Sequence, residues 1–267
     1  MTPRPPGSYA GLQRAITWAG VVLIVGSIAW FESLPRRDRL PENDKLPAIA
    51  EGPILRVVID AGHGGQDSGA IRQGVLEKDL TLDVARKLDR LLRAQGLETI
   101  LTRGGDDTVS LANRAAVANR ERDCVFVSIH FDEGGWAAAT GVQTFYAARQ
   151  APPPNTLTAW LPFLQRVSSE PTNLESQSLA SFIQEALVGR TQAFNRGTRA
   201  EQFYVVAHVV HPAVLVEGGF LSNTDDIAKL QSDEYREQLA TAISEGIMRY
   251  RETVGQREIG GGGQPGT

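Results

Sequence analysis

Short β-branched, apolar runs alternate with segments of helical periodicity along most of this chain, and this alternation constrains its fold. The run at 54–60 (ILRVVID) lies between Pro53 and a glycine-rich turn, which is typical of a buried parallel strand. A segment with apolar residues at helical spacing follows at 78–95, and Gly96 ends it. Strands that alternate with helices in this way predict an α/β fold. We expect a single domain with a mostly parallel, twisted sheet flanked by helices on both faces.

The same patterns predict the remaining elements. Further strands are expected at 97–102, 124–130, 142–146, 203–206 and 213–217. Further helices are expected at 111–122, 177–187 and 235–250. These elements define one folded domain over 54–254, and the glycine-rich residues 255–267 are predicted to form a flexible tail.

The most apolar run of the chain, Ala15 to Phe31, follows Arg14 near the N-terminus. As a helix it would span roughly 25 Å, just short of the ~30 Å hydrocarbon core of a membrane. We interpret residues 1–33 as an N-terminal apolar helix, either an uncleaved membrane anchor or a signal peptide with Ser27-Ile28-Ala29 as its cleavage site. A buried core helix is the third alternative. The proline-rich segment 34–53 lacks periodicity and is predicted to be a linker.

Charge and cysteine content narrow the class of protein. The chain has 27 basic and 31 acidic residues, and because residues 1–50 carry a net charge of +2, the rest carries −6. An acidic main body argues against nucleic-acid binding, which normally needs a basic face. Cys124 is the only cysteine, which excludes an intrachain disulfide, and its place at the start of an apolar strand predicts core packing.

Histidines and glutamates stand at the ends of the predicted strands. His63 lies in the glycine-rich turn after the first strand, and His130 and Glu217 each end a later strand. Glu77 stands at the start of the first long helix, after a polar loop that begins beside His63. Ligands of open α/β sheets bind at the carboxyl ends of the strands, so these four side chains are expected at one edge of the sheet.

This combination of side chains suits metal-assisted hydrolysis. Two imidazoles and one carboxylate are the ligands of a catalytic zinc ion that keeps a fourth position open for water, and His63, Glu77 and His130 fit these three places. A second carboxylate is needed to take the proton of the water and deliver it to the leaving amine, and Glu217 fits this role. The pattern therefore predicts a zinc-dependent amide hydrolase.

Other residues compete for places at this site. His208 and His211, in a loop before Pro212, are rival metal ligands. Asp60 and Asp132 lie close in sequence to the two predicted histidine ligands and are candidates for orienting their rings, although Asp132 equally suits a solvated loop. The sequence alone leaves these alternatives open.

Longer motifs give a more specific match. They are VVIDAGHGGQDSGAI at 57–71, EKDLTLDVARKL at 77–88, FVSIHFD at 126–132 and PAVLVEGGFLSN at 212–223. With these motifs the chain resembles the zinc-dependent N-acetylmuramoyl-L-alanine amidases of the amidase-3 family, which are peptidoglycan amidases. The resemblance runs from Val57 to about Tyr250. It departs from the family at Phe131-Asp132, where a small residue and asparagine are usual.

The resemblance implies one Zn²⁺ held by His63, Glu77 and His130, with Glu217 as the catalytic acid/base. It implies hydrolysis of the amide between the lactyl group of N-acetylmuramic acid and the L-alanine of the stem peptide. Peptidoglycan as the substrate places the exported domain in the periplasm or cell envelope, anchored in the cytoplasmic membrane if residues 1–33 are retained. No nucleic-acid partner is expected.

Residues 147–172 interrupt the α/β pattern with three consecutive prolines and an apolar patch. A long insertion in a compact domain is usually functional or mobile. In similar division amidases the corresponding segment holds a helix that blocks the zinc until an activator binds. We therefore expect Leu157 to Val167 to act as a regulatory lid for an activator protein, with a rigid surface insertion as the alternative.

Two other functions fit parts of the sequence. A zinc carboxypeptidase or endopeptidase acting within the stem peptide would need a basic residue to bind a terminal carboxylate, and Arg103, Arg114 and Arg199 are candidates. A non-catalytic peptidoglycan-binding module would be expected to lack a metal ligand or the base. All four predicted site residues are present, which favours the amidase.

Overall fold

The computed structural model describes residues 56–132, 139–150 and 173–261. Within these ranges it describes the side chains up to residue 255, except that of Asp132. The predicted N-terminal apolar helix (1–33), the linker (34–53) and most of the 147–172 insertion lie outside these ranges. Within them, no helix combines the length and the apolar character needed to cross a membrane.

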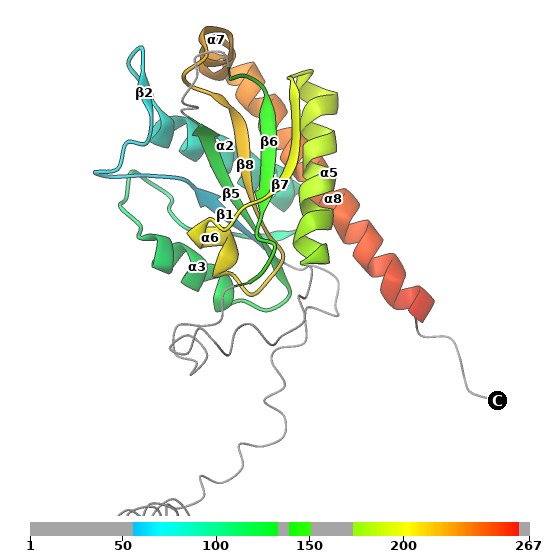
Figure 1. The fold of residues 1–267 in the computed structure, drawn as a ribbon. Coiled ribbons are helices and arrows are strands. Elements are labelled where there is room, and N and C mark those ends of the chain that lie inside the picture. Colours follow the sequence, from blue (N-terminus) through cyan, green and yellow to red (C-terminus); the bar gives the residue numbers. More distant parts are fainter. Residues whose placement is uncertain (1–55, 133–138, 151–172, 262–267) are drawn as a thin grey trace, which may run out of the picture. The chain divides into compact units, whose positions relative to one another are not determined.

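A β-sheet forms the centre of the domain (Figure 1). In the described ranges its six strands lie in the order β4 (Glu98–Leu101), β1 (Arg56–Ala61), β5 (Cys124–Asp132), β8 (Ala213–Phe220), β6 (Val142–Tyr146) and β7 (Asn195–Ala200). The first four are parallel to one another, β6 is antiparallel to β8, and β7 is parallel to β6. The predicted mostly parallel sheet is confirmed, with a reversed pair of strands at one side.

The reversal of β6 follows from the short stretch of chain before it. A parallel neighbour needs a crossover of a dozen or more residues, usually a helix. The stretch between Asp132 and Val142 is shorter than that. Strand β6 therefore begins at the edge where β5 ends, and it runs back across the sheet.

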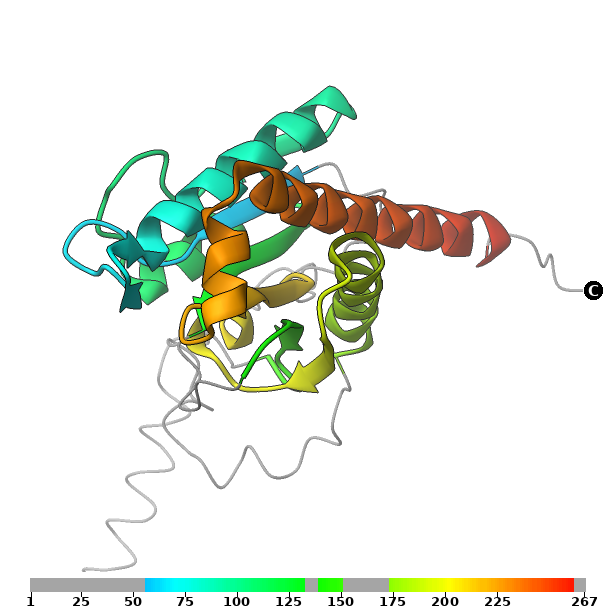
Figure 2. The same cartoon turned by 90° about the horizontal axis from the view of Figure 1, so that it is seen from above.

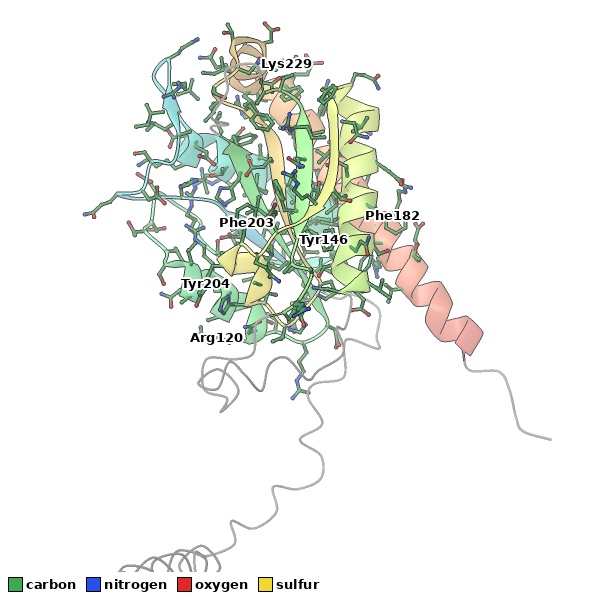
Figure 3. All side chains as sticks on the ribbon, viewed as in Figure 1. Arg120, Tyr146, Phe182, Phe203, Tyr204 and Lys229 are labelled. Carbon is green, nitrogen blue, oxygen red and sulfur yellow. The ribbon has the colours of Figure 1, made fainter. Side chains whose placement is uncertain are left out.

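Three long helices cover one face of the sheet: α2 (Glu77–Ala94), α5 (Leu174–Thr191) and α8 (Asp233–Gly261). Val57, Val127 and Val216 are fully buried in the core on this face. Figure 2 shows α8 running between α2 and α5. Phe182 of α5, labelled in Figure 3, lies on the side toward α8, where the guanidinium of Arg249 is 5.0 Å from its ring centroid.

Two shorter helices, α3 (Leu111–Asn119) and α6 (Tyr204–Ala207), pack on the other face. They contact the row of Val58, Phe126 and Ala213, and Cys124 is buried in the same cluster, as predicted. Figure 3 labels Phe203, just before α6, and Tyr204, the first residue of this helix. The predicted covering of both faces is confirmed. Toward the carboxyl ends of the strands, the same face carries the polar residues Asp60 and Ser128, followed by His130 and Glu217.

Two predicted features differ from the structure. Residues 203–206, predicted as a strand, form the beginning of α6 and its N-terminal flank. That prediction is wrong because Val205 and Val206 pack on the sheet from one helical turn instead of pairing with a strand, while Phe203 and Tyr204 stay exposed. Helix α8 also continues to Gly261, beyond residue 254, where the domain was expected to end.

Four described elements have no counterpart in the sequence prediction. Strand β7 is mostly exposed at the sheet edge and so lacks an apolar pattern. Helix α7 (Thr224–Gln231) precedes α8 and is capped by the side chain of Asn223. Strands β2 (Ile71–Arg72) and β3 (Val75–Leu76) form a hairpin, whose Gln73-Gly74 turn has φ values of 51° and 79°.

Candidate metal centre

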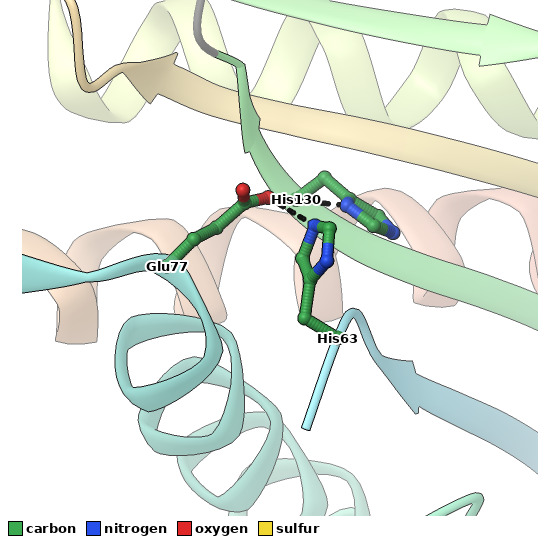
Figure 4. Close-up of side chains that lie close together, drawn as sticks. All are labelled: His63, Glu77 and His130. Carbon is green, nitrogen blue, oxygen red and sulfur yellow. Dashed lines mark hydrogen bonds and ion pairs between the residues drawn. The ribbon is translucent and has the colours of Figure 1, made fainter. Parts of the chain in front are cut away.

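Three side chains that could bind a metal ion meet at the carboxyl edge of the sheet, and they are the three predicted from the sequence. His63 follows β1, Glu77 is the first residue of α2, and His130 lies in β5. One ligand atom of each side chain lies within 4.8 Å of the other two. Oε1 of Glu77 is 3.1 Å from Nε2 of His63 and 3.1 Å from Nδ1 of His130, so that both rings face one carboxylate (Figure 4).

Backbone conformation brings the two imidazoles together. His63 has a φ of 60°, in the left-handed region, and the chain turns onward through Gly64, whose φ is 125°. A Cβ atom on Gly62 would lie 2.4 Å from the ring of His130. The backbone before His63 therefore lies directly against the second histidine.

Glu77 is held by backbone groups as well as by the histidines. It is 4% exposed, its Oε2 accepts the N–H of Ala70 at 2.9 Å, and its Oε1 accepts the N–H of Phe131 at 3.0 Å. Burial alone raises the pKa of Glu77, but hydrogen bonds from His130 and His63 outweigh it and hold this pKa well below its usual range. The side chain is therefore a carboxylate at neutral pH, the form that binds a metal ion.

Asp67 orients the ring of His63. Its Oδ2 lies 2.9 Å from Nδ1 of His63, so that Nδ1–H donates to the carboxylate and Nε2 faces Glu77. Burial lowers the pKa of His63, but the contacts with Glu77 and Asp67 outweigh burial and raise it. Asp67 is not among the residues predicted from the sequence, although an acid four residues after a histidine in a tight loop is a usable signal.

Glu217 lies beside the cluster on the neighbouring strand. It is the Cα partner of His130 in the β5–β8 pair, so both side chains project from the same face of the sheet. Glu217 is 9% exposed, and Gln143 of β6 is its partner on the other side. The register of the sheet thus brings the fourth predicted residue next to the three donors.

The prediction that Asp60 orients an imidazole is wrong. Asp60 is fully buried, and its oxygens accept hydrogen bonds from Thr102 at 2.6 Å, Arg114 at 2.7 Å and Ser128 at 2.7 Å. Asp60 therefore connects β1 to Thr102, to α3 through Arg114 and to β5 through Ser128. These bonds do not involve the imidazole rings. The side chain of Asp132 lies outside the described part of the structure.

The two rival histidines lie elsewhere. The ring of His208 stacks on that of Tyr204, with centroids 3.8 Å apart, and Nε2 of His211 is 3.0 Å from the carbonyl oxygen of Glu121. Both precede β8, whereas Glu217 lies toward its carboxyl end. Among the described residues the donor group contains neither histidine, so their prediction as rival ligands is wrong.

Two of the three arginines considered for a substrate carboxylate are engaged inside the protein. Arg103 and Arg114 are each 3% exposed, and both donate to carbonyl oxygens of the turn that carries His63. The side chain of Arg199, on β7, is 64% exposed and lies 3.9 Å from Glu201. Of these three, Arg199 alone is placed to meet a ligand from solvent.

The donor set fits a zinc ion. Two imidazole nitrogens and one carboxylate oxygen are the ligands that leave a fourth position open in catalytic zinc sites. A Cβ atom on Gly69 would lie 2.5 Å from Oε2 of Glu77 and 2.7 Å from Cδ2 of His63, so the bare backbone there makes room for the cluster.

The α/β sheet and the donor set at its carboxyl edge define a class of protein, a hydrolytic enzyme whose site suits a divalent metal ion. Comparison of the sequence with known families makes this specific. The amidase-3 family model, described as N-acetylmuramoyl-L-alanine amidase, matches residues 57–249. The chain belongs to this family, which confirms the resemblance of its motifs, and it is a hydrolase of the N-acetylmuramoyl-L-alanine amidase type.

Individual relatives agree with the family assignment. The chain is 36% identical over 194 residues to the uncharacterized protein YqiI of Bacillus subtilis, covering 73% of this chain and 84% of YqiI. It is 32% identical over 207 residues to the N-acetylmuramoyl-L-alanine amidase LytC of the same organism, covering 77% of this chain and 36% of LytC.

Solved structures share the fold. The catalytic domain of CwlV, an N-acetylmuramoyl-L-alanine amidase from Bacillus (Paenibacillus) polymyxa var. colistinus, matches with a TM-score of 0.62 and 32% identity over 74% of this chain and 98% of that one. The CwlD amidase of Clostridioides difficile, solved in complex with the GerS lipoprotein, matches with a TM-score of 0.63 and 28% identity over 74% of this chain and 99% of that one.

Proposed function

We propose that this chain is a zinc-dependent peptidoglycan amidase that cleaves the bond between N-acetylmuramic acid and the L-alanine of the stem peptide. The observation that carries the proposal is the meeting of His63, Glu77 and His130, with ligand atoms within 4.8 Å of one another. Glu217 stands beside them on the next strand. Family membership supplies the identity of the bond.

In this proposal His63, Glu77 and His130 hold the zinc ion. When bound, zinc lowers the pKa of water and polarises the amide carbonyl. Asp67 keeps the His63 ring in position through its contact with Nδ1, which leaves Nε2 for the metal. The N–H groups of Ala70 and Phe131 hold the Glu77 carboxylate in place while it serves as a ligand.

Glu217 moves the proton in the proposed reaction. Its carboxylate takes a proton from the attacking water as the new C–O bond forms. It then delivers that proton to the nitrogen of L-alanine as the C–N bond breaks, so that a neutral amine leaves. Its register next to His130 supports this role, because general acid–base transfer needs the carboxylate within hydrogen-bond reach of the reacting water.

Mass spectrometry of digested peptidoglycan tests the proposed bond. We expect intact stem peptides with a free L-alanine amine, together with glycan chains that have lost their peptides. A carboxypeptidase would release only terminal amino acids, an endopeptidase would release peptide fragments, and a binding module would release nothing. Any of these three outcomes from the metal-loaded protein would contradict the proposal.

We propose further that residues 1–33 export the domain, as an anchor or as a signal peptide, and that 34–53 links them to the catalytic domain at 54–254. The family supports an extracytoplasmic site, since peptidoglycan lies outside the cytoplasmic membrane. Fractionation of cells that express the full chain separates the alternatives. An anchor keeps the intact chain in the membrane fraction, whereas cleavage after Ala29 yields a soluble chain that begins at Trp30. Retention in the cytosol would contradict both.

An activator protein acting on the 147–172 insertion is the last part of the proposal. It is supported by the CwlD amidase, whose structure was solved in complex with a lipoprotein. Deletion of residues 151–170 is expected to raise the basal rate of peptidoglycan hydrolysis if this segment restrains the site. An unchanged or lower rate in a folded deletion variant would contradict the lid.

A further inference from the structure

Arg103 is a buried cation that joins two of the three donor-bearing segments. Its Nε donates to the carbonyl of Ala61 at 2.9 Å, and its Nη2 donates to the carbonyl of Gly62 at 2.9 Å and to that of Lys78 at 2.8 Å. Gly62 immediately precedes His63, and Lys78 immediately follows Glu77. One guanidinium therefore sets the distance between the turn after β1 and the beginning of α2.

Thr81 reinforces the same connection. It lies one turn into α2 and is fully buried. Its hydroxyl donates to the carbonyl of Gly62 at 2.8 Å and accepts a bond from Nη2 of Arg103 at 3.0 Å. The turn that carries His63 is thus attached to α2 by two side chains that share one acceptor.

Arg114, on α3, joins the third donor-bearing segment. Its Nη1 donates to Ala61 O at 2.6 Å and to Asp60 Oδ1 at 2.7 Å, and its Nη2 donates to His63 O at 2.6 Å. The other oxygen of Asp60 accepts the hydroxyl of Ser128 at 2.7 Å. Ser128 lies two residues before His130 on β5, so this chain of contacts runs from the His63 turn to the strand of the second histidine.

The backbone at His63 needs such support. A φ of 60° is uncommon for a residue other than glycine and persists where the surrounding contacts hold it. The carbonyls on both sides of this strained position, those of Gly62 and His63, are each held by a guanidinium group. A guanidinium suits this task because its donors lie in a rigid plane and reach several acceptors at fixed angles, which a lysine ammonium cannot do.

We propose that Arg103 and Arg114 are positioning residues that hold the three donor segments at the spacing a metal ion requires. This inference rests on the proposed function, because it assumes that His63, Glu77 and His130 bind zinc. Neither arginine touches the metal or the substrate. Each acts through the backbone of a donor or of its immediate neighbour.

Metal affinity of the full-length protein tests the inference. Arg103→Lys and Arg114→Lys keep the charge and remove the planar set of donors, and Thr81→Val removes one hydroxyl at constant shape. We expect each variant to lose about tenfold or more in zinc affinity, measured by competition with a chelator. The weak visible bands of bound Co²⁺, which report ligand geometry, are expected to change in parallel.

Arg236→Lys is the matched control. Arg236 also donates to two carbonyls, those of Leu230 and Gln231, and it contacts the side chain of Asp83 on α2, but its bonds reach no backbone group of a donor or of a donor's immediate neighbour. Its replacement is expected to lower the melting temperature of the metal-free protein as much as Arg103→Lys does, and to leave zinc affinity within about twofold of wild type.

The possible outcomes distinguish a failure of the positioning role of the two arginines from a failure of the proposed zinc site. Zinc binding by wild type with an unchanged affinity in the folded lysine variants would overturn the positioning role alone. Equal losses of affinity in Arg236→Lys would do the same, because they would trace the effect to stability. No zinc binding by wild type would overturn the metal site itself. If a lysine variant does not fold, Thr81→Val decides by the same criteria.

Discussion

At the scale of single residues, the donor cluster depends on a side chain that is absent. Gly62 lies against the ring of His130, and its φ is outside the left-handed region. Alanine would therefore fit the backbone at this position and collide with the neighbouring imidazole. The ring of His130 fits at this place because Gly62 has no Cβ atom.

Gly62→Ala is expected to displace His130 and to reduce zinc affinity by about tenfold or more, since a displaced ring no longer faces Glu77. Zinc bound per protein after dialysis against a metal buffer measures the effect. The control is Gly189→Ala, where an added Cβ meets no atom within 4 Å. Equal zinc content in the two variants would show that the close approach at Gly62 is immaterial.

Glu217→Gln is expected to bind zinc as wild type does and to lose at least about 100-fold in turnover, because an amide cannot accept the proton of the attacking water. His63→Ala is expected to lose the metal. His208→Ala, which alters a ring stacked on Tyr204, serves as the control for both measurements. Substantial turnover by Glu217→Gln would remove this residue from the role of acid/base.

The placement of His63, Glu77, His130 and Glu217 near one edge of the sheet could be predicted because the sequence pattern locates the strands and the helix that carry them. The contacts by which Asp67 and the two buried arginines hold the site were not predicted. Their partners are ring nitrogens and backbone carbonyls of a loop, and these meet only when that loop has folded. Asp60 shows the same limit, since its position next to the turn suggested a contact with a histidine and the fold directs it to Arg114.

At the scale of elements, α7 connects two neighbouring antiparallel strands through one carboxylate. Asp226 is 2% exposed, and it accepts bonds from the Thr140 hydroxyl at 2.7 Å and from the N–H groups of Gly141 at 3.0 Å and Phe220 at 3.2 Å. These residues stand just before β6 and at the end of β8. The helix thereby holds the strands where the sheet reverses direction.

Asp226→Ala is expected to lower the free energy of unfolding by roughly 3 kcal/mol, because it leaves buried donors without an acceptor. Urea denaturation monitored by circular dichroism measures the loss. The neighbouring exposed Asp225 provides the control, and its replacement by alanine is expected to change stability by less than about 1 kcal/mol. A similar loss in both variants would mean that α7 stabilises the domain through helix formation alone.

The long helices and the buried strands were predictable because their apolar residues recur at fixed spacing. Strand β7 has the sequence NRGTRA and lies exposed at the sheet edge, so burial imposes no pattern on it. Helix α6 is a single turn, too short for helical periodicity to show, and its residues favour strands by composition. The sequence therefore predicts an element well when enough of its residues are buried to impose an apolar pattern.

At the scale of the whole molecule, two buried acids couple stability to high pH. Burial raises the pKa of the Cys124 thiol from 9.0 to about 12 and that of Tyr235 from 10.0 to about 12. Both groups ionise earlier in the unfolded chain than in the folded one. Their contribution is therefore fully present below pH 9 and is lost as pH rises toward 12.

The free energy of unfolding is expected to fall steadily between pH 9 and pH 11 under reducing conditions. Each group that is ionised only in the unfolded chain accounts for about 1.4 kcal/mol per pH unit. Cys124→Ala should lower stability at pH 7 through lost packing and should also make the decline with pH less steep. Parallel curves for wild type and Cys124→Ala would contradict the role of the thiol.

The direction of β1 sets which way the site faces. The strand begins at Arg56 and ends just before the turn of His63, so its six residues place these points about 20 Å apart at opposite edges of the sheet. The described chain therefore enters the domain at the edge of the sheet opposite the donors. The 20 residues of segment 34–53 extend at most roughly 70 Å. The depth of wall that a tethered copy could hydrolyse would then be limited by linker length, and lengthening that segment would extend it.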